Sequence, residues 1–235
     1  MKNASEIFNS ILSSKEKITV KLLGDSITHG VGGDGFEQNG EHIVTGYSRS
    51  PHGYCWANLL RDHMLEKYGA TVVNNACTGT KIEFIIEHFD ELVSPLDDVV
   101  ICTIGTNNRH WMIEDGPKPD KDEYLEQFYQ NILRLHALFV KAEKTVIFVA
   151  NIPASVPNER DTQLFWRVLH MDDINAAYKR AAGELDFPFI SLYDLFTEYC
   201  NENAVSINEL LCDGLHPNNR GYDVMFALIK RALSV

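Results

Sequence analysis

Short apolar strands alternate with helical segments along this chain, and that alternation constrains its fold more than any other feature. The run 98–104 is almost continuously apolar and β-branched, as is typical of a central parallel strand. Four further runs predict strands, at 17–23, 71–74, 145–150 and 187–190. Apolar residues at helical spacing predict helices at 3–14, 56–68, 81–89, 120–140, 171–185, 193–201 and 219–233. The alternation predicts an α/β fold with a five-stranded parallel sheet and helices on both faces.

The predicted elements account for one domain. The chain has 235 residues, of which 45% are apolar and 23% charged, as in an ordinary globular protein. No repeat, low-complexity tract or linker divides it, so we expect residues 1–235 to form a single domain. Within residues 1–16, Ile7, Phe8 and Ile11 follow helical spacing, so a short helix is expected to pack on the outside of the sheet.

Charge and cysteine usage limit the partners of the chain. The net charge of −12 argues against nucleic acid and against an anionic membrane surface, because both require clustered Lys and Arg. No apolar run approaches the length of a membrane span or a signal peptide. The five cysteines have no C-x-x-C pair and indicate free thiols in a reducing compartment. We therefore expect a cytoplasmic protein; no prediction of its oligomeric state follows.

The first predicted strand ends at the tripeptide Gly24-Asp25-Ser26, and Gly30 permits a second bend shortly after. A serine at the carboxyl end of a strand lies where open α/β sheets bind their ligands. A strand–turn–helix corner can also present its hydroxyl as a nucleophile. The same tripeptide is an ordinary turn whose Asp or Ser can cap a helix, so this stretch alone leaves both interpretations open.

Near the other end of the chain, Asp213 and His216 form a D-x-x-H segment. A serine nucleophile needs a base to accept its proton, and the base needs an acid to hold its tautomer. We therefore assign Ser26 as the nucleophile, His216 as the base and Asp213 as the group that orients it. A surface or core role for His216 and a turn-capping role for Asp213 are the alternatives.

Four segments together resemble the GDSL/SGNH hydrolase superfamily. Residues 24–28 resemble its first block, Gly79 within 75–80 its second, 105–108 its third, and 213–217 its last. The blocks occur in the family's order and span most of the chain. Asn108 is a departure, because the third block usually ends in Asp. We expect that position to serve loop structure more than chemistry.

The resemblance implies a flavodoxin-like three-layer α/β/α sandwich with the strand order 2-1-3-4-5. It also implies an oxyanion hole made by the backbone N–H groups of Ser26 and Gly79 and the side-chain amide of Asn107. A glycine has no side chain that would keep a backbone N–H away from the substrate. The side-chain amide of Asn107 is a neutral donor, so it can hydrogen-bond the oxyanion without losing a proton. Plain turn roles for Gly79 and Asn107 are the alternatives.

Three predicted loops, at 29–54, 109–119 and 151–169, are expected to border the site. Their aromatic residues can stack on a sugar or line an acyl pocket, or can anchor the loops to the core. Arg49 and Arg109 can hold an anionic group or lie in solvated salt bridges. The candidate substrate-binding residues are Asp25, Arg49, Tyr54, Trp111 and Trp166.

These residues predict a serine esterase that works through an acyl-enzyme. The chain lacks G-x-S-x-G, phosphate-binding glycine motifs and H-E-x-x-H, and the triad requires no cofactor or metal. The resemblance favours short acyl groups, such as O-acetyl on carbohydrates. The alternatives are a lysophospholipase or thioesterase acting on longer acyl chains, and a non-catalytic ligand-binding protein with a vestigial triad.

Overall fold

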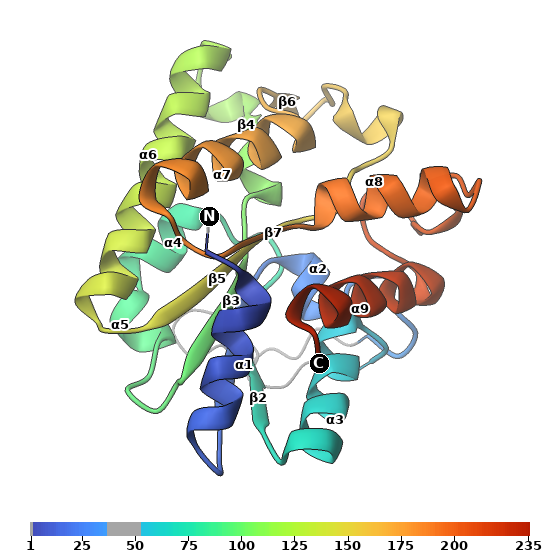
Figure 1. Cartoon of the computed structure of the whole chain (residues 1–235). Helices are drawn as coiled ribbons and strands as arrows, with labels where there is room; N and C mark the ends of the chain where they lie inside the picture. The colour runs from blue at the N-terminus through green and yellow to red at the C-terminus, as the bar shows by residue number, and fades with distance from the viewer. Residues whose placement is uncertain (1, 37–52) are drawn as a thin grey trace.

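Five parallel strands form the central sheet of this computed structural model, which describes residues 2–36 and 53–235 (Figure 1). In spatial order the strands are β2 (Thr71–Asn74), β1 (Thr19–Gly24), β3 (Val99–Thr103), β5 (Thr145–Ala150) and β7 (Phe189–Ser191). Adjacent strands pair in parallel throughout. Both the five-stranded parallel sheet and the predicted order of its strands are therefore confirmed.

Helices cover both faces of this sheet (Figure 1). One layer contains α1 (Ala4–Ser14), α3 (Trp56–Tyr68), α8 (Leu192–Glu202) and α9 (Asn219–Leu233). The opposite layer contains α4 (Ile82–Glu87), α5 (Phe89–Leu92), α6 (Lys121–Lys141) and α7 (Met171–Leu185). The three layers give the α/β/α sandwich that the sequence predicts.

Alternating side chains of the strands separate two hydrophobic cores. In β1, Leu22 belongs to the core under α1, α3, α8 and α9, whereas Leu23 belongs to the core under α4 to α7. In β5, Ile147 and Phe148 divide in the same way. Because successive side chains of a strand point to opposite faces, a strand buried on both sides is apolar at every position. This explains why β3 and β5 appear in the sequence as almost unbroken apolar runs.

The carboxyl ends of the strands carry the polar segments of the motifs. Strand β1 is followed at once by the short helix α2 (Ser26–His29), and β3 leads into the 3-10 turn η1 (Thr106–Arg109). Strand β1 lies between β2 and β3, so the connections after β1 and β3 run to opposite faces of the sheet. Such a point of reversal is where open α/β sheets bind ligands.

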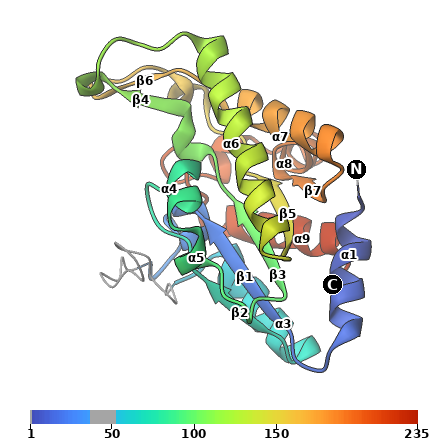
Figure 2. The same ribbon diagram turned by 90° about the vertical axis from the view of Figure 1, so that its left-hand side faces the viewer.

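Two segments expected to be loops contain a second, smaller sheet. Strand β4 (His110–Met112) pairs antiparallel with β6 (Phe165–Arg167), and both lie apart from the main sheet in Figure 2. Three 3-10 turns complete these regions and the C-terminal part of the chain: η2 (Ile113–Asp115), η3 (Val156–Glu159) and η4 (Ile207–Glu209). The helix expected at 81–89 is divided at His88 between α4 and α5.

The first and last helices lie side by side. Asn9 Nδ2 donates to the carbonyl oxygen of Leu233 at 2.9 Å, and the hydroxyls of Ser5 and Ser234 are 2.8 Å apart. The apolar side of α1 contributes Ala4 and Phe8 to the core. Among the described residues, no helix combines the length and apolar character needed to cross a membrane.

Candidate active site

Ser26 begins helix α2 immediately after strand β1. Asp25 caps this helix, because its Oδ1 accepts a hydrogen bond from the N–H of Ile27 at 3.1 Å. Gly30 ends the helix with a φ of +112°, and its N–H donates to the carbonyl oxygen of Ser26. A Cβ at Gly24 would lie only 2.5 Å from Thr103 Oγ1, so the corner requires a glycine there. The Asp25 cap, the turn at Gly30 and the close packing at Gly24 thus fix the serine at the edge of the sheet.

A continuous chain of hydrogen bonds joins Asp213, His216 and Ser26. His216 Nε2 lies 2.9 Å from Ser26 Oγ, and its Nδ1 lies 2.6 Å from Asp213 Oδ2. An ionised Asp213 accepts a hydrogen bond from the Nδ1–H of His216, which leaves Nε2 as the acceptor that faces the serine hydroxyl. The geometry is that of a nucleophile, a base and an orienting acid.

Several backbone contacts hold the loop that carries His216. Leu211 and Pro217 form a β-bridge, and the N–H of Cys212 donates to the carbonyl oxygen of His216 at 2.9 Å. The N–H of Ser155, after strand β5, donates to the carbonyl oxygen of Gly214 at 2.8 Å. These contacts tie the last loop to the edge of the sheet, so the imidazole position depends on the fold.

The two carboxylates near Ser26 have opposite electrostatic environments. Partial burial would raise the pKa of Asp213, but hydrogen bonds from the His216 side chain and from the N–H groups of His216 and Leu215 lower that pKa below its usual value. Complete burial raises the pKa of Asp25, although hydrogen bonds from Thr106 and Ile27 and electrostatic interaction with His216 and Arg109 oppose the shift. Asp213 is therefore the better orienting acid.

Gly79 and Asn107 lie on two loops that meet beside the serine corner. The N–H of Cys77 donates to the carbonyl oxygen of Gly24 at 3.1 Å, which holds the Gly79 loop against the end of β1. Asn107 Nδ2 donates to the carbonyl oxygen of Thr80 at 3.0 Å. Gly79 has a φ of +82°, a conformation that favours glycine. The structure thus brings together segments 24–26, 77–80 and 107.

Asn108, the departure from the family pattern, is buried and structural. Its Oδ1 accepts from the N–H of Ile82 at 3.0 Å, and its Nδ2 donates to the carboxylate of Glu83. Asn108 therefore fastens the turn that carries Asn107 to the first turn of helix α4. This position serves loop structure, as expected.

Asp25, one of the predicted substrate-binding residues, lies in the protein interior. Asp25 is fully buried; Ile27 N–H donates to one oxygen, and Asn151 Nδ2 donates to the other at 3.0 Å. Both oxygens of Asp25 thus have partners inside the protein, and contact of Asp25 with substrate stays a prediction. Asn151 also donates to Thr106 Oγ1 at 2.7 Å and was not predicted. Its place directly after strand β5 was the available signal.

The other candidates divide between the small sheet and the helical layer that contains α9. Trp111 and Trp166 are cross-strand partners in β4 and β6. The Tyr54 hydroxyl donates to Asp223 in α9. Arg109 is buried rather than in a solvated salt bridge, and pairs with Glu159 at 2.8 Å. Arg49 lies outside the described residues.

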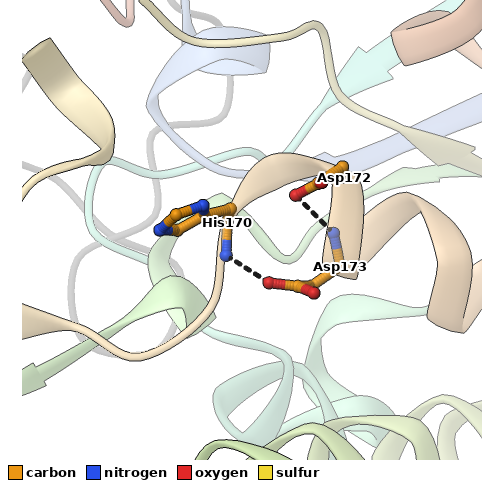
Figure 3. A group of neighbouring side chains, drawn as sticks. All are labelled: His170, Asp172 and Asp173. Carbon is orange, nitrogen blue, oxygen red and sulfur yellow. Dashed lines mark hydrogen bonds between the residues drawn. The ribbon is translucent and has the colours of Figure 1, made fainter. Parts of the chain in front are cut away.

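One cluster of possible metal ligands, His170, Asp172 and Asp173, lies at the start of helix α7 (Figure 3). Asp173 accepts from the N–H of His170 at 2.8 Å and pairs with Lys121 at 2.9 Å, while Asp172 accepts from the N–H of Asp173. Helix capping thus explains these side chains, and the cluster includes no member of the Ser26 site.

Comparisons with known proteins agree with this geometry. A profile described as the GDSL-like Lipase/Acylhydrolase family matches residues 22–224. A search of curated proteins finds no significant match.

Similar solved structures share the fold. The acetylxylan esterase Axe2 from Geobacillus stearothermophilus superposes with a TM-score of 0.64 at 20% identity, covering 93% of this chain and 94% of its own. LAE5, an alpha/beta hydrolase enzyme from the metagenome of Lake Arreo, Spain, superposes with a TM-score of 0.65 at 21% sequence identity. The match covers 92% of this chain and 95% of LAE5. A putative GDSL-like lipase from Parabacteroides merdae superposes with a TM-score of 0.66 at 15% sequence identity, covering 92% of this chain and 95% of its own. The family match spans most of the chain and includes all four motifs, so the chain belongs to the GDSL-like lipase/acylhydrolase family and is a carboxylic ester hydrolase.

Proposed function

We propose that this chain is a serine esterase that removes short acyl groups, such as O-acetyl groups on carbohydrates, through an acyl-enzyme at Ser26. The observation that carries the proposal is the hydrogen-bonded series Asp213–His216–Ser26, with separations of 2.6 and 2.9 Å. Each polar atom in the series has the partner that nucleophilic catalysis requires.

The reaction follows from the order of these groups. Ser26 Oγ attacks the ester carbonyl carbon while His216 Nε2 takes its proton, and Asp213 stabilises the imidazolium that forms. The tetrahedral intermediate breaks its bond to the alcohol oxygen, which receives the proton from His216. Water then attacks the acyl-enzyme with His216 again acting as base. The acid leaves and Ser26 recovers its proton.

Three donors are assigned to the oxyanion: the N–H groups of Ser26 and Gly79 and the side chain of Asn107. The Ser26 N–H belongs to the first turn of α2, where backbone N–H groups have no acceptor within the helix. The Asn107 side-chain NH₂ donates one hydrogen bond to the carbonyl oxygen of Thr80, and its second hydrogen can be donated to the substrate. One such donor is commonly worth about 3 kcal/mol in the transition state.

The short-acyl preference is supported by chemistry near Gly79 and by structural likeness. The Axe2 structures are described as an acetylxylan esterase, and they cover almost the whole chain. A cavity beside Gly79 is lined by polar and aromatic side chains. Both favour a small acyl group attached to a polar alcohol over a long acyl chain.

The test is hydrolysis of p-nitrophenyl esters from acetate to decanoate, with Ser26→Ala in parallel. We expect acetate to be the best substrate and Ser26→Ala to lose at least about 10⁴-fold in kcat, with the same thermal unfolding midpoint as wild type. A decanoate optimum would favour the lysophospholipase or thioesterase alternative. Equal activity of Ser26→Ala on every ester, together with no labelling by a fluorophosphonate, would favour the binding protein.

A further inference from the structure

A cavity of about 610 Å³ opens beside the loop that carries Gly79. Its walls come from residues 77–81, helix α4, Trp111 of β4 and Tyr124 of α6. Since the N–H of Cys77 donates to the carbonyl oxygen of Gly24, this loop contacts the serine corner and also lines the cavity. The volume falls within the range of small-molecule sites, roughly 300–1,000 Å³. The cavity is therefore placed to hold a part of the substrate beyond the reacting ester.

The chemistry of the wall distinguishes between the two parts of an ester. Phe84, Trp111 and Tyr124 supply aromatic rings, and Lys81, Glu87 and Gln127 supply polar groups. Among the described residues, no Leu, Ile, Val or Met lines this cavity. A site for a long acyl chain gains its affinity from burial of apolar surface and needs no hydrogen-bonding groups. Aromatic rings can pack against the C–H faces of a ligand, while the neighbouring amide and carboxylate groups hydrogen-bond its hydroxyls.

The charges of the wall favour a neutral ligand. Glu83 and Glu87 are exposed at the cavity, and Glu87 has no side-chain hydrogen bond or ion pair with any other described residue. The single ammonium group, Lys81 Nζ, donates to the carbonyl oxygen of His110 at 3.3 Å. The carboxylates of Glu83 and Glu87 outnumber the one ammonium group, which is already hydrogen-bonded, so the wall repels an anionic ligand. The same carboxylates can accept hydrogen bonds from ligand hydroxyls.

The wall is held in place before any ligand binds. The rings of Trp111 and Tyr124 meet edge to face, with centroids 6.1 Å apart, and the Tyr124 hydroxyl donates to the carbonyl oxygen of His110. Helix α4 is tied to the Asn107 turn through Asn108. A preformed wall reduces the entropy lost on binding.

We infer that this cavity is a subsite for a sugar ring of a neutral oligosaccharide, on the alcohol side of the ester and not on the acyl side. The inference rests on the proposed function for the position of the ester. It assigns Trp111 and Gln127 as specificity-determining residues: the indole covers a sugar face, and the amide hydrogen-bonds its hydroxyls.

The kinetic test compares acetylated xylotetraose with p-nitrophenyl acetate, which has no sugar. We expect Trp111→Ala and Gln127→Ala to lower kcat/KM for the oligosaccharide about tenfold, and to change that for p-nitrophenyl acetate less than twofold. Trp111→Phe should recover part of the loss. The matched control is Gln130→Ala, because Gln130 is exposed on the same helix and does not line this cavity. Equal losses on both substrates, or a loss confined to p-nitrophenyl decanoate, would overturn the assignment.

A binding test separates this inference from the catalytic proposal. Unacetylated xylotetraose is titrated into Ser26→Ala and into Ser26→Ala/Trp111→Ala by calorimetry. We expect the first protein to bind the tetrasaccharide and the second to bind at least about tenfold more weakly. Absence of binding to Ser26→Ala would reject the subsite even if the wild type hydrolyses p-nitrophenyl acetate. Binding without hydrolysis of either ester would support the subsite and reject the proposed reaction.

Discussion

Asn108 Nδ2 donates a hydrogen bond to Glu83 Oε2 at 2.8 Å, across the junction between the Asn107 turn and helix α4. Its Oδ1 accepts from the N–H of Ile82 in the same first turn. An ionised Asp, the usual residue of this motif, can accept from Ile82 but cannot donate to Glu83. The amide therefore suits a chain that places a glutamate at this point, and the two residues are expected to act as a pair.

Asn108→Asp should destabilise the protein by roughly 1–3 kcal/mol at pH 7, because it removes a buried donor and sets two carboxylates together. Mutual repulsion raises one pKa of the pair in the folded state. The deficit should therefore shrink as pH falls from 7 to 4.5, which urea unfolding can measure. Asn108→Asp/Glu83→Gln restores a donor and should recover most of the stability; a double variant no better than Asn108→Asp would contradict the pairing.

Gly79→Ala should separate backbone strain from catalysis. Gly79 and Gly69 both have positive φ, +82° and +62°, and an added Cβ meets nothing within 4 Å at either position. Each alanine should cost about 1 kcal/mol in unfolding free energy, because an L-residue is strained in this region. Only Gly79→Ala should lower kcat on p-nitrophenyl acetate, since Gly69 ends helix α3. A similar kcat for the two variants would remove Gly79 from the oxyanion hole.

Asp213→Asn should lower kcat roughly 10³–10⁴-fold, because an amide no longer holds the His216 tautomer or stabilises its charged form. The lowered pKa of Asp213 adds a second expectation. Its contribution to stability is present above the ordinary value of 3.8 and is lost as pH falls through the lower folded value. The variant should thus be less stable than wild type at pH 7, and the gap should close in strong acid. Urea unfolding at pH 7 and 3 measures this.

Asp25→Asn should show the opposite pH dependence. Burial raises the pKa of Asp25 above 3.8, so the folded state binds its proton more tightly than the unfolded chain. That contribution to stability is complete below pH 3.8 and is lost as pH rises through the folded value. Relative to wild type, the variant should therefore gain stability between pH 4 and pH 8 in urea unfolding. Parallel stability curves over this range would show that ionisation of Asp25 does not affect folding.

The central sheet could be predicted because its strands are buried on both faces. Long apolar runs such as 98–104 leave few alternative interpretations, and the alternation with helices then fixes the parallel arrangement. Ser26, Asp213 and His216 could be assigned because nucleophile, base and acid occur in motifs whose order matches a known family. Their distances could not be predicted, because they depend on loop closures such as Ser155 to Gly214.

The small sheet and the buried polar contacts escaped prediction. Strands β4 and β6 have three residues each, too few to show a period, and their pairing joins segments about 55 residues apart. The burial of Arg109 depends on Glu159 in a distant turn. Asn151 gave a weak signal, because a single Asn after a strand is also an ordinary loop residue.

The hydrogen bond between His216 and Ser26 joins positions 190 residues apart in the chain. The proposed nucleophile is therefore made early in translation and its base near the end, just before helix α9. A nascent chain that has folded its first strands has a serine without a base. Ester hydrolysis on the proposed mechanism would begin only when the last loop closes onto the sheet, so appearance of activity would report completion of folding.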